Sequence, residues 1–287
     1  MTEADETYWN NKRDMLAASY SSGHYTAEQK RLDIALHYMR KQGCQSLIDI
    51  GCGTGETLLR ATEAGIDKLS GCDLSTEMVD TTAERLLSDG KTGNLFVWDL
   101  GTVFSHAIAH THDALTCFSV LPYVPNWRNF FAALPKLVKP GGLVMLSFPN
   151  RLFDLYTLND FTADFIQSQL MARELHTSKA ITEFLGHTPA FKDSSAYAGN
   201  VNFTRVTPIE IEAQMAEYGL KAVRTHYMNY HPVPPRFEAD FDAAELEQLK
   251  QAKEKDILAS NWSDMFTHST FLTVFKYEPD SNTAGVG

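Results

Sequence analysis

The chain has 287 residues, 44% of them hydrophobic, which is enough for a substantial core in one large domain or two small ones. Its formal net charge of −11 argues against nucleic acid as the main partner, because proteins that bind a phosphate backbone concentrate positive charge. The four cysteines are widely spaced and match neither a paired metal-ligand motif nor a disulfide framework, and no run of about 18 apolar residues predicts a membrane span. We therefore expect a cytoplasmic protein with reduced thiols that binds neither nucleic acid nor membrane.

The first half of the chain begins with helical patterning and then alternates. Residues 8–41 carry apolar side chains at helical spacing, and we expect a helical lid over residues 1–42. From Leu47 onward, short segments rich in strand-forming residues alternate with helix-like segments. The strand-like segments read SLIDI, LSGCDL, NLFVWDL, DALTCFSVL and GLVMLSF. This alternation over residues 43–150 predicts right-handed βαβ crossovers and a mostly parallel sheet with helices on both faces.

The second half interrupts this pattern and then resumes it. Residues 151–205 lack the alternation and are expected to form a helical cap inserted over the ligand end of the sheet. Residues 206–278 are expected to complete the sheet, and residues 279–287 to form a flexible tail. The completing part contains, in order, a helix at 207–220, a strand at 221–230, a charged helix at 242–260 and a strand at 269–277.

The segment LIDIGCGTGETLL, at residues 47–59, places three glycines directly after the first predicted strand. In a doubly wound sheet, ligands bind beyond the carboxyl ends of the strands, where the strand order reverses. Gly51 and Gly53 can adopt turn conformations and let a ligand touch the main chain, and the next helix offers free N–H groups to an anionic end. A nucleotide-like ligand is therefore expected, although a tight turn without a ligand would also use glycine.

The spacing of these glycines discriminates between nucleotides. Dinucleotide enzymes favour G-x-G-x-x-G beside a pyrophosphate, whereas Glu56 stands at the position of the last glycine in this chain. Asp49, two residues before the loop, would repel a pyrophosphate but suits a ligand that carries an amino group. A nicotinamide oxidoreductase is therefore disfavoured.

LIDIGCGTG resembles the first motif of the class I S-adenosylmethionine-dependent methyltransferases nearly letter for letter. GCDLSTEMV, FVWDL, DALTCFSVLPYV and LVKPGGLVMLSF follow in the order of that family, so the resemblance covers roughly residues 45–148. It implies an α/β fold with a doubly wound, seven-stranded, mostly parallel Rossmann-like sheet. It also implies S-adenosyl-L-methionine as the cofactor and S-adenosyl-L-homocysteine as the product. Residues 150–200 match no general pattern of the family.

Carried over by position, the resemblance assigns cofactor contacts to the ends of the first two strands. Asp49 and the loop of Gly51, Cys52 and Gly53 would hold the methionine portion. Asp73, twenty residues after Gly53, would accept hydrogen bonds from both ribose hydroxyls. Each acidic residue of the site could alone be a helix cap instead.

The resemblance also assigns the adenine and the amino group. Adenine contacts are expected from Leu74, Met78, Trp98, Asp99 and Leu100. The main-chain carbonyl of Phe118 would meet the methionine amino group, although its side chain could equally be core. Tyr20 would close over the cofactor, with Tyr8 and Tyr25 as rivals, and any of these aromatic residues could simply be packed.

The chemistry of methyl transfer narrows what else the site needs. A sulfonium carries its methyl group as a good electrophile, so the enzyme must chiefly align the acceptor and exclude water. A general base is needed only for a protonated acceptor, and His231 is preferred because imidazole titrates near neutral pH. Tyr123 stands where relatives often have histidine and is the second catalytic candidate. His176 and His187 are rival bases, and any of these histidines could be structural. Acceptor contacts are expected from Asn150, Arg151, His187 and Tyr230.

The segment HAIAHTHD places His106, His110 and His112 close together but does not predict a metal site. Asp113 begins the next strand, and no further ligand completes a zinc site, so no metal is expected. The sequence thus predicts a methyltransferase, a monomer or homodimer, acting on an oxygen or nitrogen of a small molecule by in-line SN2 displacement. A natural product or a sugar-containing metabolite is the expected acceptor. The alternative is a non-catalytic S-adenosylmethionine-binding regulatory or scaffold protein on the same fold.

Overall fold

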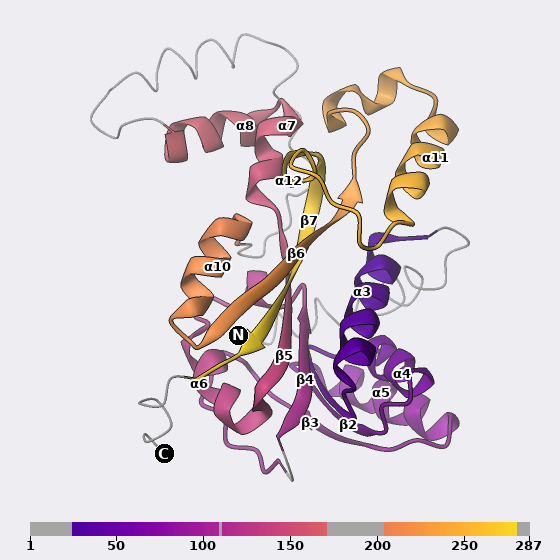
Figure 1. Ribbon diagram of the computed structural model, residues 1–287, viewed down its shortest axis with the longest axis vertical. Helices are drawn as coiled ribbons and strands as arrows, with labels where there is room; N and C mark the ends of the chain where they lie inside the picture. Colours follow the sequence, from indigo (N-terminus) through magenta and orange to yellow (C-terminus); the bar gives the residue numbers. More distant parts are fainter. Residues whose placement is uncertain (1–24, 109–110, 171–203, 280–287) are drawn as a thin grey trace.

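The computed structural model describes residues 25–108, 111–170 and 204–279 (Figure 1). Within these ranges the chain forms a seven-stranded sheet of order β3-β2-β1-β4-β5-β7-β6, in which β7 alone runs antiparallel to the rest. The strands are β1 (Ser46–Ile50), β2 (Lys68–Asp73), β3 (Gly93–Val97), β4 (His112–Phe118), β5 (Val138–Pro149), β6 (Leu220–Tyr230) and β7 (His268–Tyr277). The predicted doubly wound, mostly parallel sheet is confirmed.

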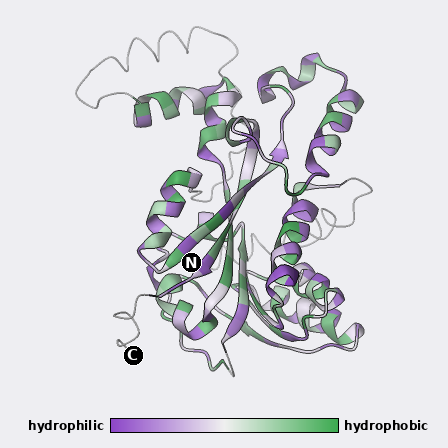
Figure 2. Cartoon of the chain, in the orientation of Figure 1, coloured by the Kyte–Doolittle hydropathy of each residue, from purple (hydrophilic) through white to green (hydrophobic). Residues whose placement is uncertain are grey.

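Helices cover both faces of the sheet (Figure 1). One face carries α3 (Ala27–Gln42), α4 (Glu56–Glu63) and α5 (Thr76–Ser88), and the other carries α6 (Arg128–Leu137) and α10 (Pro208–Ala216). Along β1, Leu47 packs in the core on the α3 face, whereas Ile48 and Ile50 pack in the core on the α6 face. The central strands β1, β4 and β5 are buried on both faces and read as largely apolar runs, whereas the edge strands β3 and β6 are partly exposed. Figure 2 shows hydrophilic segments along β6.

Side-chain caps fix where the flanking helices begin. The Thr26 hydroxyl accepts the N–H of Gln29 at 3.2 Å and starts α3, and the Ser75 hydroxyl accepts the N–H of Met78 at 3.1 Å and starts α5. Thr207 caps α10, with Pro208 at its first position. α5 therefore begins three residues beyond the end of β2, next to the predicted ribose site.

The first part of the predicted cap leaves the sheet after β5. It comprises η2 (Arg151–Phe153), α7 (Asp154–Thr157), α8 (Asp160–Phe165) and η3 (Ile166–Leu170). The two ends of this insertion are joined, because the N–H of Arg151 donates to the Val206 carbonyl at 2.9 Å and Arg205 pairs with buried Asp154 at 2.5 Å. Residues 171–203 lie outside the described ranges.

A second insertion joins β6 to β7, and its helix is shorter than predicted. The segment contains η6 (Pro235–Asp240), α11 (Ala243–Glu254) and α12 (Asp264–Thr267). A separate short helix, η1 (Leu121–Tyr123), follows β4. The helix expected over 242–260 ends at Glu254, since the Asp256 carboxylate accepts the N–H groups of Leu258 and Ala259 at 3.2 and 2.9 Å and turns the chain.

The histidines of HAIAHTHD have structural surroundings. His112 is buried in β4, with Nε2 2.8 Å from the Ser70 hydroxyl and Nδ1 3.0 Å from the Leu137 carbonyl oxygen. His106 stacks on Phe96 at 4.6 Å, and His110 lies outside the described residues. In the part of the chain that the structure describes, no three His, Cys, Asp or Glu side chains are grouped to hold a metal ion. The described helices include none that is both long and apolar enough to cross a membrane.

Candidate functional site

The carboxyl ends of three strands, β1, β2 and β4, meet at one edge of the sheet. Ile50 at the end of β1 pairs with Cys72 of β2 and with Cys117 of β4, so Gly51, Asp73 and Phe118 come next in register. The strand order reverses between β1 and β4, which is where open α/β sheets bind ligands. This edge, from Gly51 to Asp73 and Phe118, is called the cofactor edge below.

The glycine loop after β1 exposes its main chain on one side. Gly51, Gly53 and Gly55 have φ angles of 73°, 53° and 83°, a left-handed region that favours glycine. A Cβ atom added to Gly51 would lie 2.1 Å from Val120 Cγ2, whereas one added to Gly53 would meet no atom within 4 Å. Gly51 therefore permits close packing of the loop against the end of β4, and Gly53 leaves room for a ligand beside the chain.

Asp73 connects this loop with the start of α5. Its Oδ2 accepts the N–H of Gly53 at 2.9 Å, and its Oδ1 accepts the N–H of Ser75 at 3.0 Å. Burial raises the pKa of this carboxyl, while the main-chain donors lower it. Each carboxylate oxygen has two acceptor positions, so both oxygens can take a second donor such as a hydroxyl.

Asp49 lies deeper than the loop, within β1. It is 2% exposed and accepts the Thr116 hydroxyl at 2.6 Å. Burial raises its pKa to about 7, although hydroxyl donors from Thr116 and Thr57 and the charge of Arg31 lower it. A buried carboxylate with so little compensation favours a cation nearby.

Arg31 is a residue of this site that the sequence analysis missed. It reaches from α3 across the end of β4, with Nη1 2.8 Å from the Ser119 hydroxyl and Cζ 5.0 Å from the centre of the Phe118 ring. The contact joins residues 88 positions apart, so no local sequence pattern predicted it. It places a guanidinium at the cofactor edge, where a carboxylate of a ligand would be recognised.

The predicted adenine contacts divide into surface and core. Leu74 is half-buried beside Asp73, whereas Met78, in the first turn of α5, is only 2% exposed. Trp98 and Leu100 are each 3% exposed and belong to the core on the α6 face, where Trp98 meets the Phe104 ring at 4.8 Å. Both side chains therefore leave little surface for an adenine ring.

Asp99 and Cys52 are also engaged within the protein. The Asp99 carboxylate accepts the N–H of Gly101 at 2.8 Å and closes a turn after β3. This role is similar to the helix-capping role that was the alternative for each acidic residue of the site. The buried Cys52 thiol lies 3.8 Å from the Thr82 hydroxyl, and burial raises its pKa. Its side chain therefore supports the loop from below.

A pocket of about 350 Å³ lies next to the cofactor edge. Its wall is built by α3, by the ends of β4, β6 and β7, and by α11. Residues that line it include Arg31, Ser119, Met228, Asn229, Tyr230 and Lys250. Ser119 and Asn229 have φ angles of 57° and 60°, unusual for residues other than glycine. Such strain is concentrated at functional sites in proteins, and here both strained residues face one pocket.

His231 follows Tyr230 and is paired with a carboxylate. Its Nδ1 lies 2.8 Å from Glu238 Oε1, and its ring packs 4.7 Å from the Phe153 ring. Burial lowers the pKa of His231, whereas the bond to Glu238 raises it. Its Nε2 is buried and meets no hydrogen-bond partner in the described residues.

The other predicted acceptor contacts differ in their surroundings. Asn150 is 1% exposed, and its amide donates to the carbonyls of Met265 and His268, so we infer a structural role for it. Arg151 donates to the Ser168 hydroxyl at 3.0 Å and thus faces the cap. Tyr123 is half-buried in η1 and Tyr230 lines the pocket. Tyr20, Tyr8, His176 and His187 lie outside the described residues.

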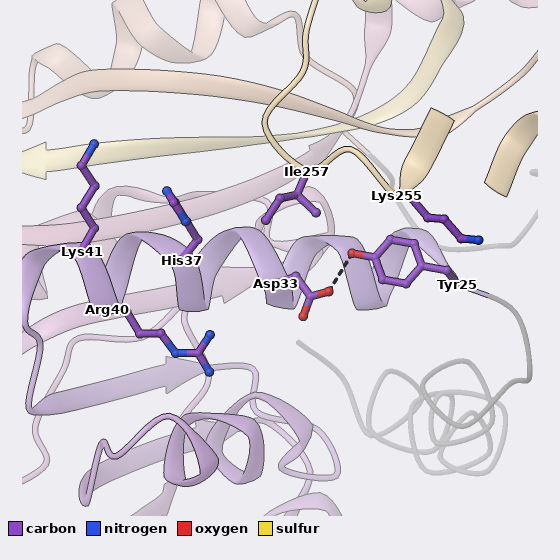
Figure 3. Close-up of a pocket in the computed structure, with 7 residues that line it drawn as sticks. All are labelled: Tyr25, Asp33, His37, Arg40, Lys41, Lys255 and Ile257. Carbon is purple, nitrogen blue, oxygen red and sulfur yellow. Dashed lines mark hydrogen bonds between the residues drawn. The ribbon is translucent and has the colours of Figure 1, made fainter. Parts of the chain in front are cut away.

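A second, shallow pocket of about 690 Å³ lies along α3 and is drawn in Figure 3. Tyr25, a rival of Tyr20, donates its hydroxyl to Asp33 there at 2.7 Å. Figure 3 shows Lys41 and Lys255 at opposite ends of this pocket and Arg40 on the other side of the helix. Because these cations do not converge, they make no anion site.

The chain is similar to known methyltransferases. Residues 48–144 match the model of a methyltransferase domain. A ubiquinone biosynthesis O-methyltransferase of Thiobacillus denitrificans is 29% identical over 203 residues, covering 69% of this chain and 75% of the relative. One of Burkholderia lata is 30% identical over 200 residues, covering 68% of this chain and 72% of the relative. The chain belongs to the class I S-adenosylmethionine-dependent methyltransferases. Its cofactor is S-adenosylmethionine, and the dinucleotide alternative is set aside.

Solved structures agree with the fold of this methyltransferase. An S-adenosylmethionine-dependent methyltransferase from Clostridium acetobutylicum superposes with a TM-score of 0.54 at 12% identity, covering 94% of this chain and 99% of that one. Magnesium protoporphyrin IX methyltransferase from Synechocystis, solved with bound S-adenosylhomocysteine, gives 0.52 at 15% identity, covering 96% and 99%. At these identities the likeness concerns the fold alone.

The cofactor edge of this methyltransferase fits S-adenosylmethionine chemically. The cofactor is a nucleoside with vicinal hydroxyls, a cationic sulfur, an ammonium and a carboxylate. The edge offers a carboxylate with spare acceptor positions at Asp73, open space beside Gly53 and a guanidinium at Arg31. Asp49, buried and short of positive charge, suits a ligand that carries cations.

Proposed function

We propose that the protein methylates a hydroxyl oxygen of a small polar molecule held in the pocket between α3, β6 and α11. The observation that carries this proposal is that Arg31 and Ser119 belong both to the cofactor edge and to the wall of that pocket. An acceptor in the pocket would therefore lie beside the methionine end of the cofactor. Relatives named O-methyltransferases make oxygen the first choice of acceptor atom.

Cofactor binding follows from the donors and acceptors at the edge. Asp73 would accept the ribose hydroxyls, and the loop of Gly51, Cys52 and Gly53 would lie along the methionine portion. Arg31 would pair with the methionine carboxylate, and the main-chain carbonyl of Phe118 would accept its ammonium. Leu74, which is half-buried beside Asp73, would border the adenine.

The reaction needs alignment more than acid–base strength. S-adenosylmethionine supplies a methyl group on cationic sulfur, which is already a good electrophile. The pocket would hold the acceptor hydroxyl in line behind that carbon and exclude water, which accounts for most of the acceleration. His231 would take the hydroxyl proton on Nε2, so that the oxygen attacks as its charge develops.

The lining of the pocket favours a polar acceptor. Lys250, Glu247 and Glu28 contribute charges to its wall, and Tyr25 and Tyr230 contribute aromatic rings. At about 350 Å³ the pocket falls at the lower end of small-molecule sites. A hydroxylated aromatic or sugar-bearing metabolite of modest size fits this chemistry.

The test is acceptor-dependent formation of S-adenosylhomocysteine, followed by mass spectrometry. The panel pairs oxygen acceptors (catechol, 3,4-dihydroxybenzoate and a phenolic glycoside) with nitrogen counterparts (aniline, 3-aminobenzoate and an amino sugar). We expect product with at least one oxygen acceptor and a mass gain of one methyl group on it. Product only with amines would contradict an oxygen acceptor, and cofactor binding without any product would favour the non-catalytic alternative.

A further inference from the structure

The bend after β6 folds a carboxylate back onto the histidine that ends the strand. His231 is fixed by its main chain, whose N–H donates to the Thr267 carbonyl at 2.9 Å. Its ring lies between Phe153 of η2 and Glu238 of η6, with Nδ1 2.8 Å from Glu238 Oε1. The side chains are 12% and 30% exposed. The imidazole is therefore held from two sides and at its main chain.

This geometry decides which ring nitrogen can accept a proton. A neutral imidazole that donates from Nδ1 to a carboxylate keeps its lone pair on Nε2. In the described part of the chain Nε2 of His231 is buried and has no hydrogen-bond partner. A buried acceptor without a donor is costly, so the site favours a ligand that brings an O–H group to it.

We propose that Glu238 is a positioning residue for methyl transfer, which holds His231 in the tautomer that leaves Nε2 free to take the proton of the acceptor hydroxyl. This inference rests on the proposed function, in which His231 is the base. It assigns a role to a glutamate that lies across a proline-rich bend from the histidine.

The charges around the pair support this role. Lys250 of α11 lies 3.3 Å from the same Glu238 oxygen, so the carboxylate is held between two donors. Tyr156 of α7 is a further titratable side chain at this bend, with its hydroxyl 3.3 Å from the Pro232 carbonyl. The same stretch of chain also contains Tyr230, Arg236 and Asp240. Burial and Lys250 lower the pKa of His231 and Glu238 raises it, so the ring is neutral and able to accept a proton at neutral pH.

The pair lies behind two residues of the pocket wall and does not itself line the pocket. Tyr230 and Lys250 both line that pocket, and they are the chain neighbour of His231 and the ion-pair partner of Glu238. Arg31 lines the same pocket from the cofactor edge. The bend is therefore linked to the pocket through Tyr230 and Lys250.

The first measurement is the tautomer of His231 by long-range ¹H–¹⁵N NMR of histidine-labelled protein, with the signal assigned from the spectrum of His231→Gln. We expect the proton on Nδ1 in the wild type. In Glu238→Gln the amide can donate to Nδ1 and move the proton to Nε2, and the pKa of His231 should fall by about one unit, a tenfold change in proton affinity. Lys250→Gln should move the pKa upward, and Glu245→Gln, on an exposed position of the same segment, should leave it unchanged.

The second measurement is the pH profile of methyl transfer to the best oxygen acceptor of the panel. In Glu238→Gln we expect kcat to fall on the order of 100-fold at neutral pH, with little change in KM for S-adenosylmethionine. Its acidic limb should move with the pKa measured by NMR. A role confined to folding would lower kcat and stability together without moving that limb.

Distinct outcomes separate the two proposals. A proton on Nε2 in wild-type His231 overturns the positioning role, and this result needs no variant to fold. The expected tautomer with an unchanged pH profile in Glu238→Gln also overturns it, while methyl transfer itself stands. Absence of S-adenosylhomocysteine with every acceptor overturns the proposed function and, with it, the catalytic role of the pair.

Discussion

The cofactor edge and the acceptor pocket are built by different means. At the cofactor edge, most contacts come from the main chain and from residues at neighbouring strand ends. An example is the hydrogen bond from the Gly53 N–H to the Asp73 carboxylate, which joins residues twenty apart. Around the acceptor pocket, side chains from distant helices meet, as in the buried pair of Lys30 and Glu254 between α3 and α11. The first region is encoded mainly by short motifs at the ends of successive strands, and the second by long-range charge pairs whose energies depend on burial.

The largest effect on stability is expected at the buried pair between α3 and α11. Lys30 Nζ lies 3.0 Å from Glu254 Oε2, with side-chain exposures of 3% and 5%, and Glu254 also accepts the N–H of Tyr230. Lys30→Met leaves a buried carboxylate unpaired and should lower the free energy of unfolding by about 3–5 kcal/mol, measured by urea denaturation. Lys91→Met breaks the exposed pair with Asp67 and should cost at most about 1 kcal/mol. Equal costs for the two variants would contradict the contrast.

The glycine loop should separate folding from binding. Gly51→Ala would place Cβ 2.1 Å from Val120 Cγ2 at a φ of 73°, and we expect a loss of about 2–4 kcal/mol in the free energy of unfolding. Gly53→Ala meets no atom within 4 Å and should cost only about 1 kcal/mol from its φ of 53°. Gly53→Ala should nevertheless weaken the binding of S-adenosylhomocysteine about tenfold, because the methyl group enters the space left for the ligand. Val120→Ala should partly restore Gly51→Ala, and no rescue would argue against the close contact.

Asp49 should make stability depend on pH in an unusual direction. Its pKa is about 7 in the folded protein, so the folded state holds a proton that the unfolded chain, titrating near about 4, has lost. The free energy of unfolding should therefore fall as the pH rises from about 4 to about 7 and stay level above. Asp49→Asn should remove this fall and be more stable than the wild type at pH 8 by about 1–3 kcal/mol.

Asp113 is the matched control for Asp49. Partial burial raises the pKa of Asp113, but Lys139 at 2.6 Å lowers it to about 2. This carboxylate stabilises the fold above the unfolded pKa and loses that contribution as the pH falls towards about 2, so Asp113→Asn should be destabilised at pH 8. Thermal unfolding of both variants without ligand, from pH 2 to 8, measures the two slopes. Slopes of the same sign would contradict the burial of an undercompensated Asp49.

Arg31 should affect cofactor affinity modestly and stability little. It carries a charge to the cofactor edge, and Arg31→Met should weaken the binding of S-adenosylhomocysteine about tenfold, the loss of one charge-assisted hydrogen bond. Arg40→Met, exposed near the end of the same helix, is the control and should bind as the wild type does. Unchanged affinity in Arg31→Met by calorimetry would remove Arg31 from the site.

The sheet and the cofactor edge could be predicted because their signals are local. Strand ends that meet at one edge bring Gly51, Asp73 and Phe118 together whatever the details of packing. Trp98 and Leu100 were assigned to adenine, but an apolar residue after a strand serves a core equally well, and both are packed in the core. Sequence pattern cannot tell these two uses apart.

The acceptor side could not be predicted to the same depth. His231 was identified as a titratable group at a strand end. Its pairing with Glu238 depends on a bend through the four residues that follow His231 in the HPVPP segment. Arg31 and Lys30 find their partners on β4 and α11, and such pairing over long sequence distance leaves no periodic signal. The helix predicted to reach residue 260 ends early because Asp256 caps the following turn. The pattern of charged residues in this segment did not predict that turn.

The contrast between the two regions is tested most directly by calorimetric titration of S-adenosylhomocysteine into the wild type, Asp73→Ala and His231→Ala. Asp73 holds the loop N–H of Gly53 and offers the acceptor positions for ribose, so Asp73→Ala should weaken binding about 100-fold, near 2.7 kcal/mol. His231 belongs to the acceptor side, and His231→Ala should bind within about twofold of the wild type. Unchanged binding in Asp73→Ala, or an equal loss in His231→Ala, would contradict the division of the site into a cofactor edge and a separate acceptor pocket.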